Sequence, residues 1–274
     1  MKFKKYQSVG NDFVIIDRPL LSPEKVKKIC DRHFGIGADG ILFFKKSSEF
    51  DAVMKIMNSD GSSAKMCGNG LRCFVKYLAD HKGLSKDTLT VKTDNGPLLC
   101  HLRKKGGKDG SNGNLKIDVS LGKPCILKDS SGHPVFDRIF KYKEDCFRVC
   151  GISMGNSHIV CLKNEMTVEE ARRISGILRY ENPLGKQTNA EAVFNIDRAN
   201  RSVEIIVNEY GAGYTLGCGT GGGAVFHALC ESGIAEKDSS WKIHFPGGNL
   251  IYSYDKTGDV VSSGYAEHLF SGEI

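Results

Sequence analysis

Short apolar stretches recur along the chain and predict β-strands, because alternating or continuous apolar residues fit a sheet with one or both faces buried. In the first half the predicted strands are residues 3–6, 13–16, 41–44, 53–57, 88–92, 98–102 and 115–119. In the second half they are residues 147–154, 158–162, 192–197 and 203–207. Strands therefore run through both halves of the sequence.

Four segments between these strands have apolar residues at helical spacing: residues 23–33, 70–82, 167–178 and 221–231. Ser22 is suited to cap the first helix, and Pro23 occupies its first position. The last segment has no charged residue before Glu231, so we expect it to be buried on all sides. Strands and helices in this order predict a mixed α/β (α+β) fold.

Two motifs occur twice, in the same order and at nearly the same offset. Residues 10–13, Gly-Asn-Asp-Phe, return as Gly-Asn-Ser-His at 155–158. Residues 67–70, Cys-Gly-Asn-Gly, return as Cys-Gly-Thr-Gly at 218–221. This repetition predicts two similar halves. The segment 123–137, which contains Pro124, Gly132 and Pro134, is the best candidate for the linker between them.

The composition is that of an ordinary globular protein, with 40% hydrophobic and 26% charged residues, and no apolar run is long enough to cross a membrane. The net charge of +6 is spread along the chain. Its only dense cluster, Arg103-Lys104-Lys105 with Lys108, lies among glycines and predicts a hairpin loop. Because no aromatic residue interleaves with these charges, we expect no nucleic-acid site.

The N-terminus shows no secretion signal, so we expect a cytoplasmic protein whose 10 cysteines are thiols. Each Cys-Gly-x-Gly motif leads into a predicted helix. At a helix start the dipole lowers the pKa of a cysteine, and the N–H groups suit an anion such as a carboxylate. Two thiols brought to one cleft are what a two-base racemase needs: one removes the α-proton and the other supplies a proton from the opposite face.

The motif stretches lie at residues 8–13, 34–40, 58–62, 66–73, 155–158, 188–189, 209–211 and 215–221. In these stretches the chain resembles the diaminopimelate epimerase family, the amino-acid epimerases and racemases that work without pyridoxal phosphate. The resemblance implies two similar domains, each a curved mixed sheet around a central helix, with the active-site cleft between them. It places the first domain at residues 1–122 with 266–274 and the second at 123–265.

The resemblance also implies roles for individual residues. Cys67 and Cys218 are the acid/base thiols, and His158 and Glu209 assist them. The substrate-binding residues are Asn11, Asn58, Gly68, Asn69, Asn156, Asn189, Gly219 and Thr220, with Tyr210 at the far end of the substrate. The family implies no cofactor and no metal, and the partner is a small amino acid. A homodimer is left open.

Tyr210 departs from the family pattern, which has an arginine after the glutamate to pair with the distal carboxylate of diaminopimelate. Loss of such a bidentate partner costs several kcal/mol of binding. Ser157 and Tyr214 also differ from the pattern. We therefore expect a substrate without a distal carboxylate, with histidine as the first choice because tyrosines suit a flat side chain. Diaminopimelate is the alternative if a cation such as Lys65 or Arg72 compensates.

Alternatives of another class use the same cysteines for thiol redox chemistry or metal binding, or keep the cleft in an inactive binding module. Cys146 and Cys150 have a spacing seen in metal sites, but no matching Cys or His pair lies near them. The remaining cysteines, at 30, 73, 100, 125, 161 and 230, are expected to be buried in the core.

Overall fold

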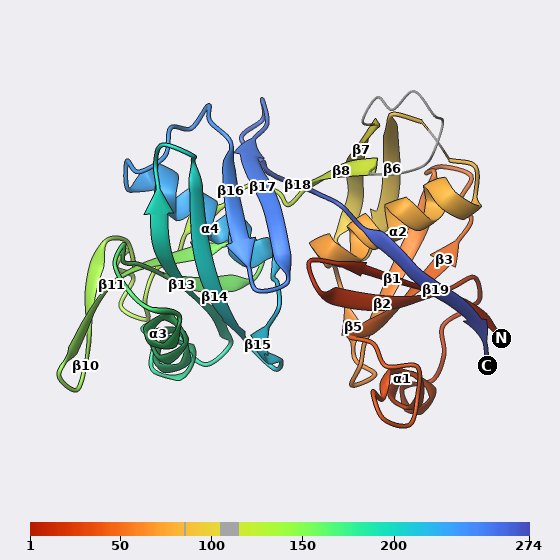
Figure 1. The fold of residues 1–274 in the computed structure, drawn as a ribbon, viewed down its shortest axis with the longest axis horizontal. Helices are drawn as coiled ribbons and strands as arrows, with labels where there is room; N and C mark the ends of the chain where they lie inside the picture. Colours follow the sequence, from red (N-terminus) through yellow and green to blue (C-terminus); the bar gives the residue numbers. More distant parts are fainter. Residues whose placement is uncertain (85, 105–114) are drawn as a thin grey trace. The chain divides into compact units, whose positions relative to one another are not determined.

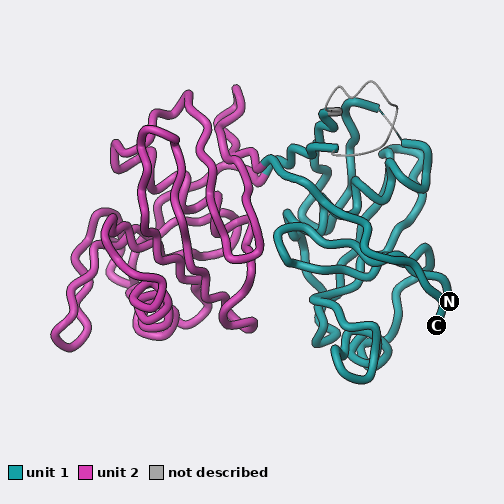
Figure 2. The backbone as a smooth tube through the Cα atoms, in the orientation of Figure 1, with its two compact units in different colours: residues 1–120, 263–274 teal, residues 121–262 magenta. Residues whose placement is uncertain are grey.

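The computed structural model describes residues 1–84, 86–104 and 115–274. The chain divides into two compact units, Met1–Ser120 with Ser263–Ile274 and Leu121–Ser262 (Figure 2). The predicted basic loop around Lys105 and Lys108 lies outside the described residues. None of the described helices is long and apolar enough to cross a membrane.

The described residues of the first unit form a mixed sheet with two helices, α1 and α2, which are labelled in Figure 1. Its strands are β1 (Lys2–Ser8), β2 (Asn11–Ile16), β3 (Gly40–Lys45), β4 (Ala52–Asn58), β5 (Ser63–Ala64), β6 (Thr88–Thr93), β7 (Gly96–Lys104), β8 (Leu115–Ser120) and β19 (Glu267–Glu273). Its helices are α1 (Pro23–Cys30) and α2 (Gly68–His81). Helix α2 contacts β1, β2 and β8, so the sheet wraps round it. The last strand, β19, pairs antiparallel with β1.

The second unit has the same kinds of element. Its strands are β9 (Cys125–Ile126), β10 (Arg138–Tyr142), β11 (Asp145–Ser153), β12 (Ser157–Leu162), β13 (Thr188–Asp197), β14 (Ser202–Glu209), β15 (Gly213–Thr215), β16 (Trp241–Phe245) and β17 (Gly248–Tyr254). Strand β18 (Val260–Gly264) leads back into the first unit. The helices are α3 (Val168–Tyr180) and α4 (Gly219–Glu231).

The strand pairings confirm the duplication that the motifs predict. In the first unit β1–β2 is antiparallel, β2–β3 parallel, β3–β4 antiparallel, β4–β6 parallel and β6–β7 antiparallel. The series β11, β12, β13, β14, β16 and β17 repeats this sequence of pairings. Helix α3 takes the place of α1 and α4 that of α2 in the element order.

Side chains alternate between the two faces of the second sheet. One face packs in an apolar cluster, and the other carries the candidate site residues. Residues Ile159, Ala190 and Ile206 pack in the apolar cluster with Ile174 of α3. Their neighbours in sequence therefore point to the other face, which contacts α4. Helix α4 is buried along almost its whole length, as its sequence predicts.

Two sequence predictions are wrong in their bounds. The first helix ends at Cys30 and not at residue 33, because the carboxylate of Asp31 accepts the backbone N–H groups of His33 and Phe34 and turns the chain. The proposed linker 123–137 belongs to the second unit: β9 pairs with β11, and Val135 is fully buried in the core. The hydrogen bonds of this segment are made to its own sheet.

We expect Gly222→Ala to destabilise the protein by about 1–3 kcal/mol. A Cβ at Gly222 would collide with the hydroxyl of Tyr252, which is fully buried and donates to the carbonyl of Gly219. Gly223→Ala is the matched control in the same helix, because its Cβ would meet the ends of flexible side chains, Met154 at 3.1 Å and Leu121 at 3.2 Å. Urea unfolding measures both variants; equal stabilities would contradict this account of α4 packing.

Candidate active site

Cys67 lies at the start of α2 and caps the helix with its sulfur. The Sγ atom accepts the backbone N–H of Gly70 at 3.3 Å, and the carbonyl of Cys67 accepts the N–H of Leu71 at 2.8 Å. The thiol itself donates to Oδ1 of Asn11 at 3.7 Å. The N–H groups of Gly68 and Asn69 belong to the same first turn of α2.

Cys218 is the N-cap of α4 and repeats this arrangement. Its Sγ accepts the N–H of Gly221 at 3.4 Å, and its carbonyl accepts the N–H of Gly222 at 3.0 Å. Thr220 places its hydroxyl 3.5 Å from the sulfur. The sequence prediction that both Cys-Gly-x-Gly motifs start helices is confirmed.

The charge environment of Cys218 corrects the prediction of a lowered pKa. Burial raises the pKa of the Cys218 thiol well above its usual value, and the nearby carboxylates of Glu209 and Glu191 raise it further. Hydrogen bonds from Thr220 and Gly221 oppose this but do not reverse it. At neutral pH the residue is a thiol, so it needs a proton acceptor before it can act as a base.

The carboxyl group of Glu209 is hydrogen-bonded to this thiol. Burial raises the pKa of its carboxyl group, while hydrogen bonds from Thr215 and Cys218 lower it. The Thr215 hydroxyl donates to Oε1 of Glu209 at 2.5 Å, which fixes the carboxylate beside the thiol. Thr215 was not predicted as a site residue; its place in the Thr-Leu-Gly-Cys stretch was the only signal in the sequence.

His158 is fully buried on the same face of the sheet. Its Nδ1 lies 2.7 Å from Oε1 of Glu191, which is also fully buried, and its Nε2 lies 3.1 Å from Oδ1 of Asn156. The amide nitrogen of Asn156 donates to the hydroxyl of Thr220 at 3.4 Å. These contacts link His158 to Cys218 through two side chains. Sequence reasoning missed Glu191.

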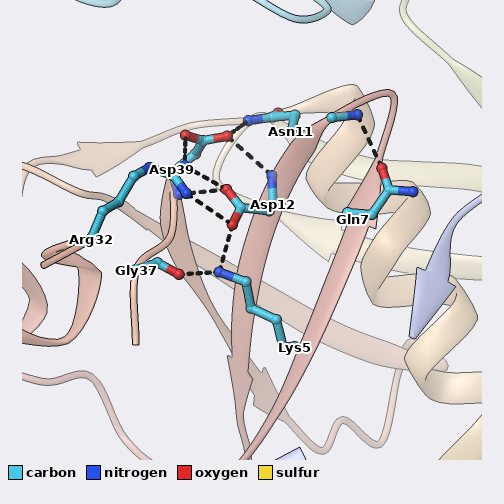
Figure 3. Close-up of polar contacts among 8 residues, drawn as sticks. Lys5, Gln7, Asn11, Asp12, Arg32, Gly37 and Asp39 are labelled. Atoms are coloured by element: carbon cyan, nitrogen blue, oxygen red, sulfur yellow. Dashed lines mark hydrogen bonds and ion pairs between the residues drawn. The ribbon is translucent and has the colours of Figure 1, made fainter. Parts of the chain in front are cut away.

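Asn11 is oriented by a network of charged side chains in the first unit (Figure 3). Its amide nitrogen donates to Asp39, so its oxygen faces Cys67. Arg32 joins Asp39 to Asp12, with 2.7 Å from its Nη2 atom to each carboxylate. Asp39 belongs to the Phe-Gly-Ile-Gly-Ala-Asp-Gly stretch, to which the sequence assigned no role. Its role here is to fix the direction of the Asn11 amide.

Lys5 completes this network from the interior. Its ammonium group is buried, lies 2.6 Å from Oδ2 of Asp12 and donates to the carbonyl of Gly37. Burial alone would raise the pKa of Asp12, but hydrogen bonds from Arg32 and Lys5 hold it below its usual value. The carboxylate is therefore ionised, as a stable ion-pair network requires.

The remaining predicted site residues divide between the two units. In the first unit, Asn58 ends β4 and donates to Ser62, and Asn69 accepts from Arg72. In the second unit, Asn189 donates to the carbonyl of Ser157 and accepts the N–H of Tyr210. Asn189 thus fixes the backbone at the position where the family motif departs.

All 10 cysteines, each within the described part of the chain, are free thiols. Cys30, Cys73, Cys100, Cys161 and Cys230 are buried as predicted, whereas Cys125 is exposed because it lies on the short edge strand β9. Among residues 1–84, 86–104 and 115–274, no group of three His, Cys, Asp or Glu side chains is arranged to hold a metal ion.

Comparison with known proteins places this geometry in a family. A family model described as diaminopimelate epimerase matches residues 3–125. The chain is 33% identical to the diaminopimelate epimerase of Methanococcus maripaludis (strain C5) and 34% identical to that of Leptospira biflexa serovar Patoc, over 100% of this chain and 99% of each relative. The chain belongs to the diaminopimelate epimerase family.

This membership confirms the predicted enzyme class, an amino-acid epimerase or racemase that works without pyridoxal phosphate. Among solved structures, a phenazine biosynthesis protein of the PhzF family from Bacillus anthracis matches with a TM-score of 0.73 and 16% identity, over 100% of this chain and 98% of that one. That similarity confirms the predicted fold class.

We expect Glu209→Gln to lower the pH at which Cys218 becomes reactive, by about 1 unit or more, because the substitution removes a negative charge beside the thiol. The rate of alkylation by iodoacetamide, followed by mass spectrometry as a function of pH, measures this shift. The exposed Cys146 serves as the internal reference, with an unchanged profile. A Cys218 profile that stays in place or moves to higher pH would contradict the assigned interaction.

Proposed function

We propose that the protein inverts the α-carbon of an amino acid by proton transfer between Cys67 and Cys218, and that diaminopimelate is its substrate. Two observations support this. Both thiols cap Gly-rich helix starts in equivalent positions of a duplicated fold. The relatives that match the whole chain at 33–34% identity are diaminopimelate epimerases.

The α-carboxylate of the substrate is bound by the two helix starts. The N–H groups of Gly68 and Asn69 come from α2, and those of Gly219 and Thr220 come from α4. Helix N-termini present backbone donors and a positive dipole end, which suits a carboxylate. In this proposal the two half-sites act on the same substrate, each with its thiol toward one face of the α-carbon.

Each turnover leaves one proton on Glu209 and removes one from Cys67, and exchange with water restores both groups before the next turnover in the same direction. Glu209 accepts the thiol proton of Cys218, and the resulting thiolate takes the α-proton. The carbanion then takes the thiol proton of Cys67 on the opposite face, which leaves Cys67 as the thiolate. Donors at the carboxylate stabilise the charge that develops in the transition state. In the reverse direction the thiolate of Cys67 removes the proton and Cys218 supplies one.

Histidine is the second candidate, and Tyr210 is the observation that favours it. The Tyr210 ring is 53% exposed and stacks on the guanidinium of Arg179, 4.9 Å from the ring centroid. No guanidinium stands at position 210 itself, where the family motif has arginine. Arg72 is not the compensating cation, because it is fully buried and donates to Ser8 and Asn69. Lys65 is exposed.

Chiral chromatography after incubation with LL-diaminopimelate, or with L-histidine, distinguishes the candidates. We expect meso-diaminopimelate to form from the first substrate. Conversion of histidine alone would replace the first candidate by the second, and conversion of neither would contradict both. Cys67→Ala and Cys218→Ala each remove one of the two acid/base groups, and we expect turnover to fall about 10²-fold or more. Cys125→Ala, an exposed thiol outside the site, is the control.

A further inference from the structure

The two units differ at the positions that surround their capping cysteines. The register of β12 against β13 matches that of β2 against β3. By this register Phe13 takes the place of His158, and Leu42 takes the place of Glu191. The helices agree: a Cβ on Gly70 would lie 3.4 Å from both Leu42 and Phe13.

In the second unit the equivalent helix position, Gly221, faces a carboxylate group. A Cβ on Gly221 would lie 2.7 Å from Oε1 of Glu191, so only glycine leaves room for the carboxylate there. His158 and Glu191 are fully buried and lie 2.7 Å apart. Within the described part of the chain, the second oxygen of Glu191 has no hydrogen-bond partner.

Packing does not explain this pair. Burial of a charged or polar pair is expensive, and an apolar pair of similar volume is often as stable or more stable. The first unit contains such an apolar pair, Phe13 and Leu42, both nearly or fully buried in the same topology. The fold is therefore compatible with either kind of pair. The charged pair is explained by the chemistry of Cys218 and not by packing.

We propose that Glu191 is a positioning residue, which acts through His158: it keeps both ring nitrogens of His158 protonated, so that an ordered series of donors points at the sulfur of Cys218. The effect of Glu191 on catalysis rests on the two-base function proposed above. Glu191 touches neither the thiol proton nor the α-carbon.

The direction of the hydrogen bonds carries this inference. Nδ1 of His158 donates to the carboxylate of Glu191, which only accepts. Nε2 donates to Oδ1 of Asn156, and the amide nitrogen of Asn156 in turn donates to the hydroxyl oxygen of Thr220. The hydroxyl hydrogen of Thr220 is then left for the sulfur, 3.5 Å away.

This series complements the role of Glu209 on the other side of the thiol. Once Glu209 has taken the proton from Cys218, the thiolate has the Thr220 hydroxyl and the Gly221 N–H as donors. The carboxylates of Glu191 and Glu209 both interact with His158. Cys67 has the opposite arrangement, since an amide oxygen faces its thiol.

The nitrogen NMR spectrum of 15N-histidine-labelled protein tests the inference without substrate, because protonated and unprotonated ring nitrogens have well-separated shifts. In the wild type we expect the signals of both His158 nitrogens in the range of N–H groups, because an acceptor oxygen of Glu191 or Asn156 faces each of them. In Glu191→Gln, which keeps the size of the side chain, we expect one of them to be unprotonated. His227, whose Nδ1 contacts Tyr254, should stay unchanged as the internal control.

A double variant separates positioning from stability. His158→Phe with Glu191→Leu copies the apolar pair of the first unit, so we expect it to fold with a melting temperature at least as high as that of the wild type. Its missing NMR signals also assign His158. We expect Glu191→Gln and the double variant to lower kcat about 10²-fold with little change in KM.

Two results would overturn the inference: an unprotonated nitrogen of His158 in the wild type, or unchanged His158 signals and kcat in Glu191→Gln. The wild-type spectrum alone decides the first, even if a variant fails to fold. Failure of the proposed function is a separate result, since a protein that turns over no amino acid would still show, or lack, the doubly protonated His158.

Discussion

A cysteine sulfur that caps a buried helix is the interaction on which the rest of this molecule depends. An N-cap side chain must accept an N–H from the first turn, and oxygen atoms usually do so. Here sulfur accepts the N–H of Gly70 or Gly221. This use holds the thiol at the helix start, next to N–H groups that suit a carboxylate. This cap also requires glycines in the first turn of each helix, because the backbone there passes close to the sulfur and to the sheet.

The duplicated fold provides two such caps, and the surrounding side chains make them unequal. The charged network of Lys5, Asp12, Arg32 and Asp39 orients one amide so that its oxygen meets Cys67. In the second unit, buried Glu191 and His158 orient the equivalent amide in the opposite sense. In one unit an amide oxygen faces the thiol, and in the other the amide nitrogen donates to Thr220 beside the thiol. Two unlike caps suit a reaction in which one sulfur takes a proton and the other gives one.

Much of this fold could be predicted from local sequence patterns. The repeated motifs predicted the duplication, and the apolar segment after Gly221 predicted a buried helix. Glu191 was not predicted as a site residue, because a single acidic residue before an apolar run indicates the end of a strand. Its burial is explained by its contact with His158, which is distant in the sequence. Strands β16 and β17 escaped for a related reason, since polar residues such as Lys242 and Asn249 interrupt their apolar positions. The segment 123–137 has the composition of a linker, but its hydrogen bonds to β11 decide otherwise.

The central claim is that two thiols exchange protons with opposite faces of one α-carbon. Turnover in D₂O tests it most directly, with mass spectrometry of the separated substrate and product after the first few per cent of reaction. The account predicts solvent deuterium at the α-carbon of the product and almost none in the recovered substrate, because different groups remove and supply the proton. Equal labelling of substrate and product from the start would show a single exchanging base and would contradict the account.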